Sequence, residues 1–288
     1  MKLFVTGGTG FVGSHVLQQA LAAGHEVIAL RRPGSQTRIP LDTEEPTWLD
    51  GALDGDHREA LRGVDVWVHL ASHTPNPPYA PLDACLYWNV YAPIKLAQQA
   101  LQAGVGRFIV AGSCFEYGRA AEGLDEIRTD TPLAPTLSYP SSKAAASQAF
   151  AGFAREHGVQ LKLLRIFQVY GEGEQASRLW PSLRLAARSG ADFPMSAGEQ
   201  VRDFVDVVDV ARQFIRHLDF DAHPSPKGEP SIHHIASGHP QTLLAFAQHW
   251  WAHWGATGKI LPGAMPYRKH EIMRLVPHLD PDTLHDHA

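Results

Sequence analysis

The sequence predicts an α/β fold in which helices cover both faces of a parallel β-sheet. Apolar runs of strand length alternate with helical patterns: strands are expected at 2–6, 26–30, 64–72, 107–113 and 160–167, and helices at 11–24, 84–103 and 141–157. Strands that are apolar along their whole length are typical of a sheet buried on both faces. Each intervening helix serves as a crossover, which predicts parallel order.

A second, smaller part follows. The chain has 288 residues, more than a single hydrophobic core usually holds. Beyond about residue 168 the alternation becomes irregular, with short strands expected at 199–205 and 231–237 and helices at 174–190, 206–218 and 241–255. We predict a larger domain over residues 1–167. We predict a smaller α/β lobe over 168–288, from which some chain returns to the larger domain.

Composition excludes several classes of protein. The net charge is −5 without a long run of either sign, so neither a nucleic acid nor a membrane surface is an expected partner. No apolar run is long enough to span a bilayer, and the start "MKLFVTGG" enters a strand without a signal-peptide pattern. Two cysteines make no disulfide framework, so a cytoplasmic setting is expected. The histidines lack metal-ligand spacing, and the final "HDHA" is interpreted as a solvated tail, so no metal is expected.

A glycine-rich stretch, "VTGGTGFVGSH" (residues 5–15), joins the first strand to the first helix. Gly8, Gly10 and Gly13 fit G-x-G-x-x-G, and Gly7, Gly10 and Gly13 fit G-x-x-G-x-x-G. Glycines let the backbone approach a pyrophosphate, and the helix N-terminus supplies free N–H groups. The strand before and the helix after are the context that this motif requires. We therefore predict a dinucleotide site rather than an unliganded turn.

The end of the second strand bears on which dinucleotide binds. NAD sites usually place an acid there for the ribose 2′-hydroxyl, but this chain has Arg31 and Arg32 in "VIALRRPGSQTR". A guanidinium can pair with the 2′-phosphate of NADP, and such a charge-assisted bond is worth about 1.5–3 kcal/mol. We predict NADP. NAD remains possible if the two arginines are simply solvated.

The stretch "LSYPSSKAAASQAF" (residues 137–150) places Tyr139 and Lys143 one helical turn apart. A free tyrosine has a pKa of about 10 and is a poor base at neutral pH, and a nearby ammonium makes proton transfer practicable. Ser113 ends the strand 107–113, at the edge where α/β ligand sites form. We predict that Tyr139 exchanges the substrate proton during hydride transfer, that Ser113 holds the substrate oxygen, and that Lys143 also bonds the nicotinamide ribose.

A set of motifs runs through most of the chain, over about residues 1–275: "TGGTGFVG", "GVDVWVHLAS", "WNVYAPIKLAQQA", "VAGSCFEYG", "YPSSK", "RIFQVYGEGE" and "EQVRDFVDVVDVA". Together they resemble the extended short-chain dehydrogenase/reductases, the NAD-dependent epimerase/dehydratase family. The resemblance implies a Rossmann-type doubly wound sheet and a smaller C-terminal lobe that binds substrate. It also implies that Ser113, Tyr139 and Lys143 form a catalytic triad.

The resemblance, with the glycines and arginines above, gives two sets of binding residues. Those expected at the cofactor are Gly7, Gly10, Phe11, Val12, Gly13, Arg31, Arg32, Leu53, Leu70, Ala71, Ser72, Asn89, Tyr139, Lys143 and Ile166. Those expected at a nucleotide-sugar substrate are His73, Ser113, Glu116, Gln168 and Arg202.

Each of these assignments has a structural alternative. Asn89 matches a residue that supports the nicotinamide region, but an asparagine can also cap or bridge a helix. Arg202 matches an arginine that often binds a diphosphate, but it can also pair with Asp203 or Asp206. Glu116 is as plausible at the surface as against sugar hydroxyls. Gln168 lies where the family often has an asparagine that contacts the nucleotide sugar.

Two departures from the family pattern narrow the reaction. In "GSCFEYG", Cys114 and Phe115 stand where the family's dehydratases carry Asp-Glu, and neither can act as the required acid and base. This argues against a 4,6-dehydratase. The acid usual in the adenine loop is not obvious in "WLDGALDGDH", where Leu53 and Asp54 are the candidates.

The predicted reaction follows from the motifs that remain. "GSCFEYG" with "FQVYGEGE" is most similar to reductases of nucleotide-linked 4-keto-6-deoxyhexoses. We predict reduction of the C4 ketone, with Tyr139 as general acid and Ser113 polarising the carbonyl. A nucleotide-sugar 4-epimerase with tightly bound NAD is the alternative. A non-catalytic dinucleotide-binding regulator is a third interpretation, and the intact triad argues against it.

Two helical segments also carry predictions about packing. Members of the family often dimerise through two helices per subunit, which here correspond to 84–103 and 141–157, so a homodimer is expected. In "AFAQHWWAHWG" (245–255), Phe246, Trp250 and Trp254 fall on one helical stripe. Such a stripe is typical of core or interface packing rather than of a sugar platform.

Overall fold

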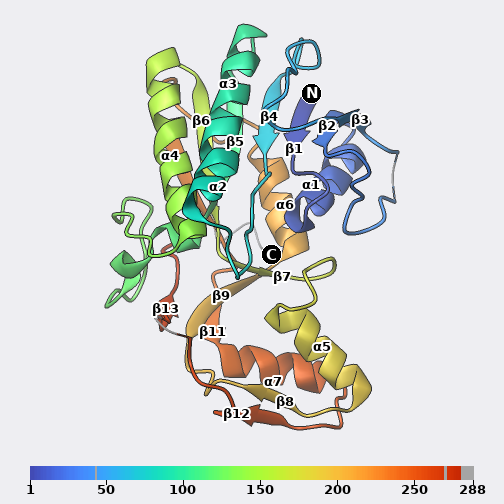
Figure 1. The fold of residues 1–288 in the computed structure, drawn as a ribbon, viewed down its shortest axis with the longest axis vertical. Helices are drawn as coiled ribbons and strands as arrows, with labels where there is room; N and C mark the ends of the chain where they lie inside the picture. Colours follow the sequence, from blue (N-terminus) through green and yellow to red (C-terminus); the bar gives the residue numbers. More distant parts are fainter. Residues whose placement is uncertain (43, 269–270, 280–288) are drawn as a thin grey trace.

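The computed structural model describes residues 1–42, 44–268 and 271–279 (Figure 1). Its larger part is built on a seven-stranded sheet of order β10-β6-β5-β4-β1-β2-β3, in which neighbouring strands run parallel. The strands are β1 (Lys2–Thr6), β2 (Glu26–Arg31), β3 (Thr47–Asp50), β4 (Val66–His69), β5 (Arg107–Ser113), β6 (Gln160–Ile166) and β10 (Pro230–Ile235). The predicted α/β class is confirmed.

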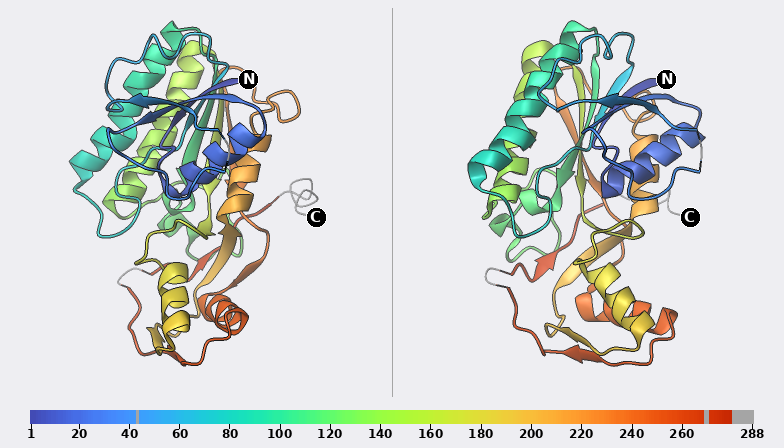
Figure 2. Two further views of the ribbon diagram at one scale, coloured as in Figure 1. Left: turned by 90° about the vertical axis from the view of Figure 1, so that its right-hand side faces the viewer. Right: turned by 45° about the vertical axis from the view of Figure 1, so that its right-hand side comes forward.

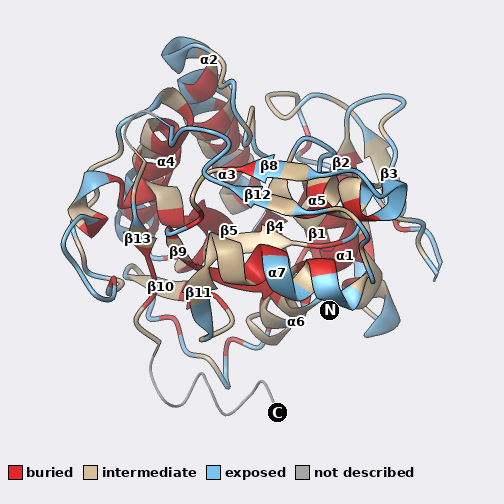
Figure 3. Ribbon diagram, turned by 90° about the horizontal axis from the view of Figure 1, so that it is seen from below, coloured by how far each residue is buried: buried red, intermediate tan, exposed pale blue. Residues whose placement is uncertain are grey.

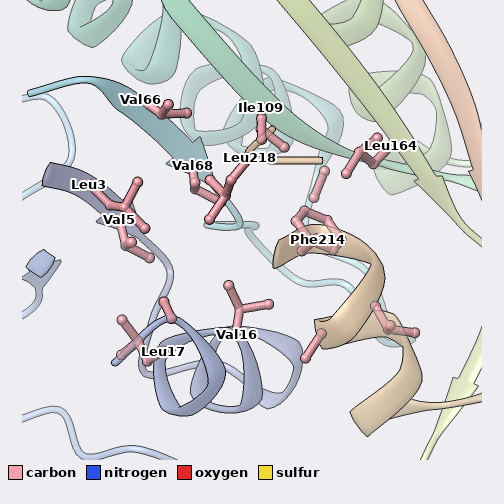
Figure 4. Close-up of a cluster of buried hydrophobic side chains, with 14 of the residues drawn as sticks. Leu3, Val5, Val16, Leu17, Val66, Val68, Ile109, Leu164, Phe214 and Leu218 are labelled. Atoms are coloured by element: carbon pink, nitrogen blue, oxygen red, sulfur yellow. The ribbon is translucent and has the colours of Figure 1, made fainter. Parts of the chain in front are cut away.

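Helices cover both faces of this sheet (Figures 1 and 2). On one face Val16 of α1 and Phe214 of α6 pack with Val5 and Val68 of the strands, as Figure 4 shows. On the other face α3 and α4 bury residues such as Leu96 against the sheet. The helices are α1 (Phe11–Ala22), α2 (Leu82–Leu86), α3 (Ala92–Gln102), α4 (Ser138–His157) and α6 (Val207–Arg216), with a π turn η1 (Tyr87–Tyr91) and short 3₁₀ turns η2 (Cys114–Glu116) and η3 (Arg119–Ala121).

The strand order reverses between β1 and β4. The chain proceeds from β1 to β2 and β3 on one side, and from β4 to β5, β6 and β10 on the other. The two central strands end together, with Thr6 opposite His69 and their side chains joined by a buried 2.7 Å hydrogen bond. Ligands of open α/β sheets bind beyond the carboxyl ends of the strands at such a reversal. The candidate site is therefore expected above Thr6 and His69.

The smaller lobe has β9 at its centre. It pairs with β7 and β13 in parallel and with β11 antiparallel, while β8 and β12 form a separate ladder. Seen from this lobe, α7 shows buried and exposed residues on different sides, the pattern of a helix that covers a core (Figure 3). The elements are β7 (Gln168–Tyr170), α5 (Leu179–Ser189), β8 (Phe193–Met195), β9 (Val201–Asp206), β11 (Pro240–Thr242), α7 (Leu243–His253), β12 (Ile260–Pro262) and β13 (Arg274–Leu275).

The aromatic stripe of α7 lies in the core of this lobe. The Phe246 ring stacks on Phe204 with centroids 3.9 Å apart, and Trp250 and Trp254 contact the ring of Trp180. These side chains form one apolar cluster. The predicted core packing is confirmed.

The structure also shows which chain returns to the larger domain. The strand expected at 231–237 is β10, and it pairs with β6 in the main sheet instead of joining the smaller lobe. The helix expected at 206–218 is α6, and it packs beside α1 on that sheet. The helix α6 is placed where its apolar side is buried, and β10 is placed where it covers the edge of the sheet. Neither placement follows from the position of the segment along the chain.

Candidate active site

The loop between β1 and α1 fits a dinucleotide. Gly7 has φ +85°, and a Cβ there would lie 2.3 Å from the backbone nitrogen of Ala71. A Cβ on Gly13 would lie 2.0 Å from the Gly7 carbonyl oxygen. Within the described chain, no side chain caps α1 at Gly10, so its first N–H groups are open to a ligand. Backbone N–H groups at a helix N-terminus are what a pyrophosphate binds, so this loop fits the cofactor that the motif predicts.

The other residues predicted for the cofactor lie along the same edge of the sheet. The strands β1, β4 and β6 run parallel, so their carboxyl ends share that edge. Three groups occur there: Phe11 and Val12 in the first turn of α1, residues 70–72 after β4, and Ile166 at the end of β6. Their contact with a cofactor stays a prediction.

At the end of β2, where the adenosine half of the cofactor is expected, the structure adds an acidic residue that the sequence interpretation did not include. Arg31 ends β2 and faces Asp50 at the end of β3, with its Nε 2.8 Å from the carboxylate. Its guanidinium also lies 4.5 Å from the centre of the Trp48 ring. Asp50 is thus an acid beside the end of the second strand, supplied by the neighbouring strand. The charge of Arg31 is already matched, whereas Arg32 is exposed, and Leu53 packs against the apolar cluster below.

Ser113, Tyr139 and Lys143 come together where β5 meets α4. Ser113 is the last residue of β5, and the other two lie in the first turns of α4. Their exposed fractions are 7%, 7% and 5%, so the cluster is almost closed to water. The Lys143 ammonium donates a 2.6 Å hydrogen bond to the carbonyl of Ala111, which fixes it against β5.

Burial sets the protonation of this cluster. Burial raises the pKa of Tyr139 above its usual range, and hydrogen bonds with Ser72 and Ser113 offset part of that rise. Burial lowers the pKa of Lys143, while the negative charge of Glu116 raises it. The phenol of Tyr139 is therefore protonated at neutral pH, which is the state that a general acid requires.

Asn89 links the loop after β4 to α4. It lies in the π turn η1 and is the buried residue of that turn. Its amide oxygen accepts a 2.6 Å hydrogen bond from the backbone of His73, and its amide nitrogen donates to the Ser142 hydroxyl at 2.9 Å. Asn89 therefore bridges the loop after β4 and the helix α4, which is the structural role that the sequence left open. In the same loop, the ring of Tyr79 lies 5.4 Å from that of Tyr139.

Arg202 is not free to meet a ligand in this structure. Its guanidinium is 2.9 Å from the carboxylate of Glu271 and also donates to the carbonyls of Val201 and Ile272. Neither acid considered from the sequence is its partner: Asp203 accepts from backbone N–H groups of residues 237 and 238. The register of β9 and β13 brings this distant carboxylate to Arg202.

Glu116 does not lie where the sequence interpretation put it. Its exposed fraction is 0%, so it is not a surface residue. Its carboxylate accepts hydrogen bonds from the Ser113 backbone at 2.7 Å and the Ser147 hydroxyl at 2.7 Å, and it pairs with Arg165 at 3.2 Å. With its oxygens bonded inside the protein, Glu116 is not available to sugar hydroxyls. The predicted substrate contact is corrected to an internal one.

A small cavity lies within the smaller lobe, bounded by β7, the segment that leads into α5, β9 and α7. Its volume is about 10 Å³, roughly that of one water, and its wall includes Gln168, Tyr170, Glu174, Arg178 and Trp180. One carboxylate oxygen of Glu174 and the indole nitrogen of Trp180 have no hydrogen-bond partner among the described residues. Of these residues, only Gln168 was predicted from the sequence. Glu174 and Arg178 are four residues apart, a spacing typical of ion pairs, and the Arg178 Nε lies 3.2 Å from the Glu174 carboxylate.

Glu174 gives a testable dependence of stability on pH. Burial raises its pKa from 4.5 to about 7, against the opposite effect of Arg178. Between these values the unfolded chain has lost a proton that the folded chain retains, so the free energy of unfolding falls as pH rises. The fall is at most about 3 kcal/mol. Chemical denaturation at pH 4.5 and pH 7.5 measures it, and Glu174→Gln is expected to remove it.

The matched control is Glu172→Gln, because Glu172 is exposed and pairs with Arg184 at the surface. This variant is expected to keep the fall. An equal fall in wild type and in Glu174→Gln would contradict the assignment.

The described part of the chain contains neither a cluster of metal ligands nor a helix that could span a membrane. No cluster of three or more His, Cys, Asp or Glu side chains there has the geometry of a metal site. The "HDHA" tail lies outside the described residues. Among the described helices, none is both long and apolar enough to cross a bilayer.

The fold and the buried triad define a dinucleotide-dependent enzyme, and comparison with known proteins identifies its family. The profile described as "NAD dependent epimerase/dehydratase family" matches residues 3–229. The chain belongs to this family.

Individual relatives are distant. A UDP-glucose 4-epimerase of Corynebacterium glutamicum is 26% identical over 267 residues, covering 83% of this chain and 76% of the relative. A dTDP-6-deoxy-L-talose 4-dehydrogenase (NAD(+)) of Aggregatibacter actinomycetemcomitans is 24% identical over 277 residues, covering 95% of this chain and 98% of the relative. Among solved structures, MoeE5 in complex with UDP-glucuronic acid and NAD superposes with a TM-score of 0.80 at 25% identity, covering 97% of this chain and 90% of MoeE5.

Proposed function

We propose that this enzyme modifies a nucleotide sugar, and specifically that it reduces the C4 ketone of a nucleotide-linked 4-keto-6-deoxyhexose. The observation that carries the proposal is the buried cluster of Ser113, Tyr139 and Lys143 at the dinucleotide edge of the sheet. The relatives include epimerases and 4-dehydrogenases of nucleotide sugars, and their activities support the substrate class.

The residues of the cluster divide the work of the reaction. When bound, the nicotinamide cofactor supplies the hydride. The Ser113 oxygen accepts a 3.3 Å hydrogen bond from the backbone of Phe115, and its hydroxyl bonds the Tyr139 phenol. In the proposed complex this hydroxyl turns its proton to the ketone oxygen, which then lies beside both groups. Tyr139 then donates its proton to that oxygen as the alcohol forms. The ammonium of Lys143 stabilises the phenolate that remains, which keeps the transfer practicable.

The structure around Ser113 supports reduction over elimination of water. Elimination needs an acid and a base beside the sugar, and the two residues after Ser113 supply neither. Burial raises the pKa of the Cys114 thiol to about 12, so the thiol stays neutral, and Phe115 has no ionisable group. We therefore do not propose a 4,6-dehydratase.

A nucleotide-sugar 4-epimerase with retained NAD is the second candidate. The ion pair of Arg31 with Asp50 favours it, because a matched guanidinium attracts a 2′-phosphate less strongly. Exposed Arg32 keeps NADP as our proposed cofactor. The coverage of the relatives supports the reductase. The alignment covers 98% of the length of the dTDP-6-deoxy-L-talose 4-dehydrogenase, but 76% of the length of the Corynebacterium epimerase.

The cofactor itself tests the proposal. The purified protein is denatured with acid, and any released nucleotide is identified by chromatography. We expect empty protein or partial NADP, followed by substrate-dependent NADPH oxidation with a panel of nucleotide-linked 4-keto-6-deoxyhexoses. Stoichiometric NAD, with interconversion of 4-epimers and no net oxidation, would overturn the reductase in favour of the epimerase.

We also propose that the enzyme is a homodimer. The outer side of α2 and η1 carries exposed apolar side chains on consecutive turns: Leu82, Leu86, Tyr87 and Tyr91. These residues precede α3 and lie beside α4, the two helices that the sequence interpretation placed at the interface. Burial of this surface in a second copy would remove it from water.

A further inference from the structure

We propose that Glu116 is a positioning residue that holds Ser113 in register with Tyr139 and Lys143. The inference deepens the proposed reductase function and rests on it. Glu116 follows Ser113 by one short turn, and its side chain returns to bond the Ser113 backbone. Together with the bond from the Phe115 backbone to the Ser113 hydroxyl, it forms a capping box, which is common and needs no burial. The remaining contacts of Glu116 go beyond a cap.

The carboxylate of Glu116 connects the two elements that carry the triad. One oxygen accepts from the backbone nitrogen of Ser113 on β5 at 2.7 Å. The other accepts from the hydroxyl of Ser147 at 2.7 Å. Ser147 is one helical turn beyond Lys143 on α4, so it faces the same side of the helix. A shift of α4 along β5 would therefore stretch these bonds as well as the bond from Lys143 to Ala111.

Arg165 makes this arrangement rigid. Its Nε lies 3.2 Å from the Glu116 carboxylate, and both side chains are almost fully buried. The Nη1 atom of Arg165 donates to the Tyr117 hydroxyl at 2.6 Å and to the carbonyl of Thr129 at 3.0 Å. Removing one partner of a buried ion pair is strongly destabilising, because it leaves an uncompensated charge inside the protein. Arg165 thus holds the Glu116 carboxylate, and with it one negative charge whose counter-ion is the guanidinium, beside the triad.

That charge acts on the chemistry as well as on the geometry. The negative charge of Glu116 raises the pKa of Lys143 and raises that of Tyr139. It therefore favours the ammonium form of the lysine and the protonated form of the phenol together. Both forms are those that ketone reduction requires of this pair.

Two variants separate the charge from the bond to α4. Glu116→Gln keeps the size of the side chain but removes its charge, and it leaves Arg165 or Ser147 without its present partner. Ser147→Ala removes the tie to α4 and leaves the charge in place. Glu122→Gln is the matched control, because Glu122 is exposed and lies 3.7 Å from Arg119 at the surface.

The kinetic test uses the full-length enzyme with NADPH and its 4-keto sugar. Glu116→Gln is expected to lower kcat by at least about tenfold with KM changed less than about twofold, because a misplacement of even 1 Å can cost about 100-fold. Its activity is also expected to fall at a lower pH than that of wild type, because the phenol loses its proton earlier. Ser147→Ala is expected to lower kcat without moving this pH limb, and Glu122→Gln to leave both unchanged.

Crystal structures of the same variants test the positioning whatever the substrate proves to be. Ser113 is expected to move relative to Tyr139 by more than about 0.5 Å in Glu116→Gln, the tolerance within which a catalytic group must be held. An unmoved triad, or a folded Glu116→Gln enzyme with wild-type kcat and pH profile, overturns the inference. If Glu116→Gln does not fold, unchanged kcat and geometry in Ser147→Ala overturn it. A wild-type enzyme inactive on every 4-keto sugar instead refutes the proposed function, and the structural comparison still decides the role of Glu116.

Discussion

Replacing Tyr139 with phenylalanine is expected to lower kcat by about 10²–10⁴-fold, the usual contribution of a positioned general acid. The phenol is buried and protonated at neutral pH, and in the proposed reduction its hydroxyl proton passes to the alcohol product. Phenylalanine keeps the ring against Tyr79 and removes only that proton. The measurement is kcat and KM for the 4-keto sugar, with cofactor affinity determined separately by titration.

Cofactor affinity and the melting temperature of Tyr139→Phe are expected to stay close to those of wild type. The matched control is Tyr267→Phe, since Tyr267 is an exposed tyrosine whose hydroxyl bonds only the surface carboxylate of Glu199 among the described contacts, and it should tolerate the same change. If Tyr139→Phe turned over at the wild-type rate, the role proposed for Tyr139 would be wrong, and the proton would have to come from another group.

Replacing Gly13 with alanine is expected to weaken cofactor binding by at least about 100-fold, or about 3 kcal/mol. The added Cβ would lie 2.0 Å from the carbonyl oxygen of Gly7, inside any permitted contact. Because the opposing atom belongs to the backbone, no rotamer change relieves the clash, and the loop that cradles the pyrophosphate must move. Titration of NADPH and NADH by fluorescence measures the loss.

Gly152→Ala provides the control for a glycine in a helix. Gly152 lies in α4, and a Cβ there would meet no atom within 4 Å. Alanine at such a site is expected to stabilise the helix by up to about 1 kcal/mol and to leave cofactor binding unchanged. Tight binding retained in Gly13→Ala would show that the loop adapts, and the dinucleotide site assigned to it would then need revision.

The sequence predicted those parts of the protein where the chemistry demands a residue type at a fixed spacing. Gly7 and Gly13 are required by close backbone approach, and Tyr139 and Lys143 must share one side of a helix. These features are local, so a linear pattern contains them. The same holds for the apolar strands such as residues 107–113, which are apolar because they are buried on both faces.

The sequence did not reveal pairings that depend on register between distant strands. Asp50 meets Arg31 because β2 and β3 lie side by side, and β3 is a short edge strand without an apolar run. Glu271 meets Arg202 near the β9–β13 ladder. Glu116 was read as a substrate contact because nothing along the chain indicates that residues 147 and 165 enclose it. Each of these contacts arises only when the tertiary fold forms.

The path of the chain between the two parts has a consequence for engineering. The polypeptide leaves the main sheet after β6, returns with α6 and β10, and leaves again for β11. After β13, the backbone carbonyl of Val276 accepts from Ile127, which ties the last described segment to the larger domain. The smaller lobe is therefore a set of insertions rather than a detachable module. A chimera that exchanges this lobe for a relative's must be spliced at several junctions, and a fragment cut after residue 167 would lack both an edge strand and a covering helix.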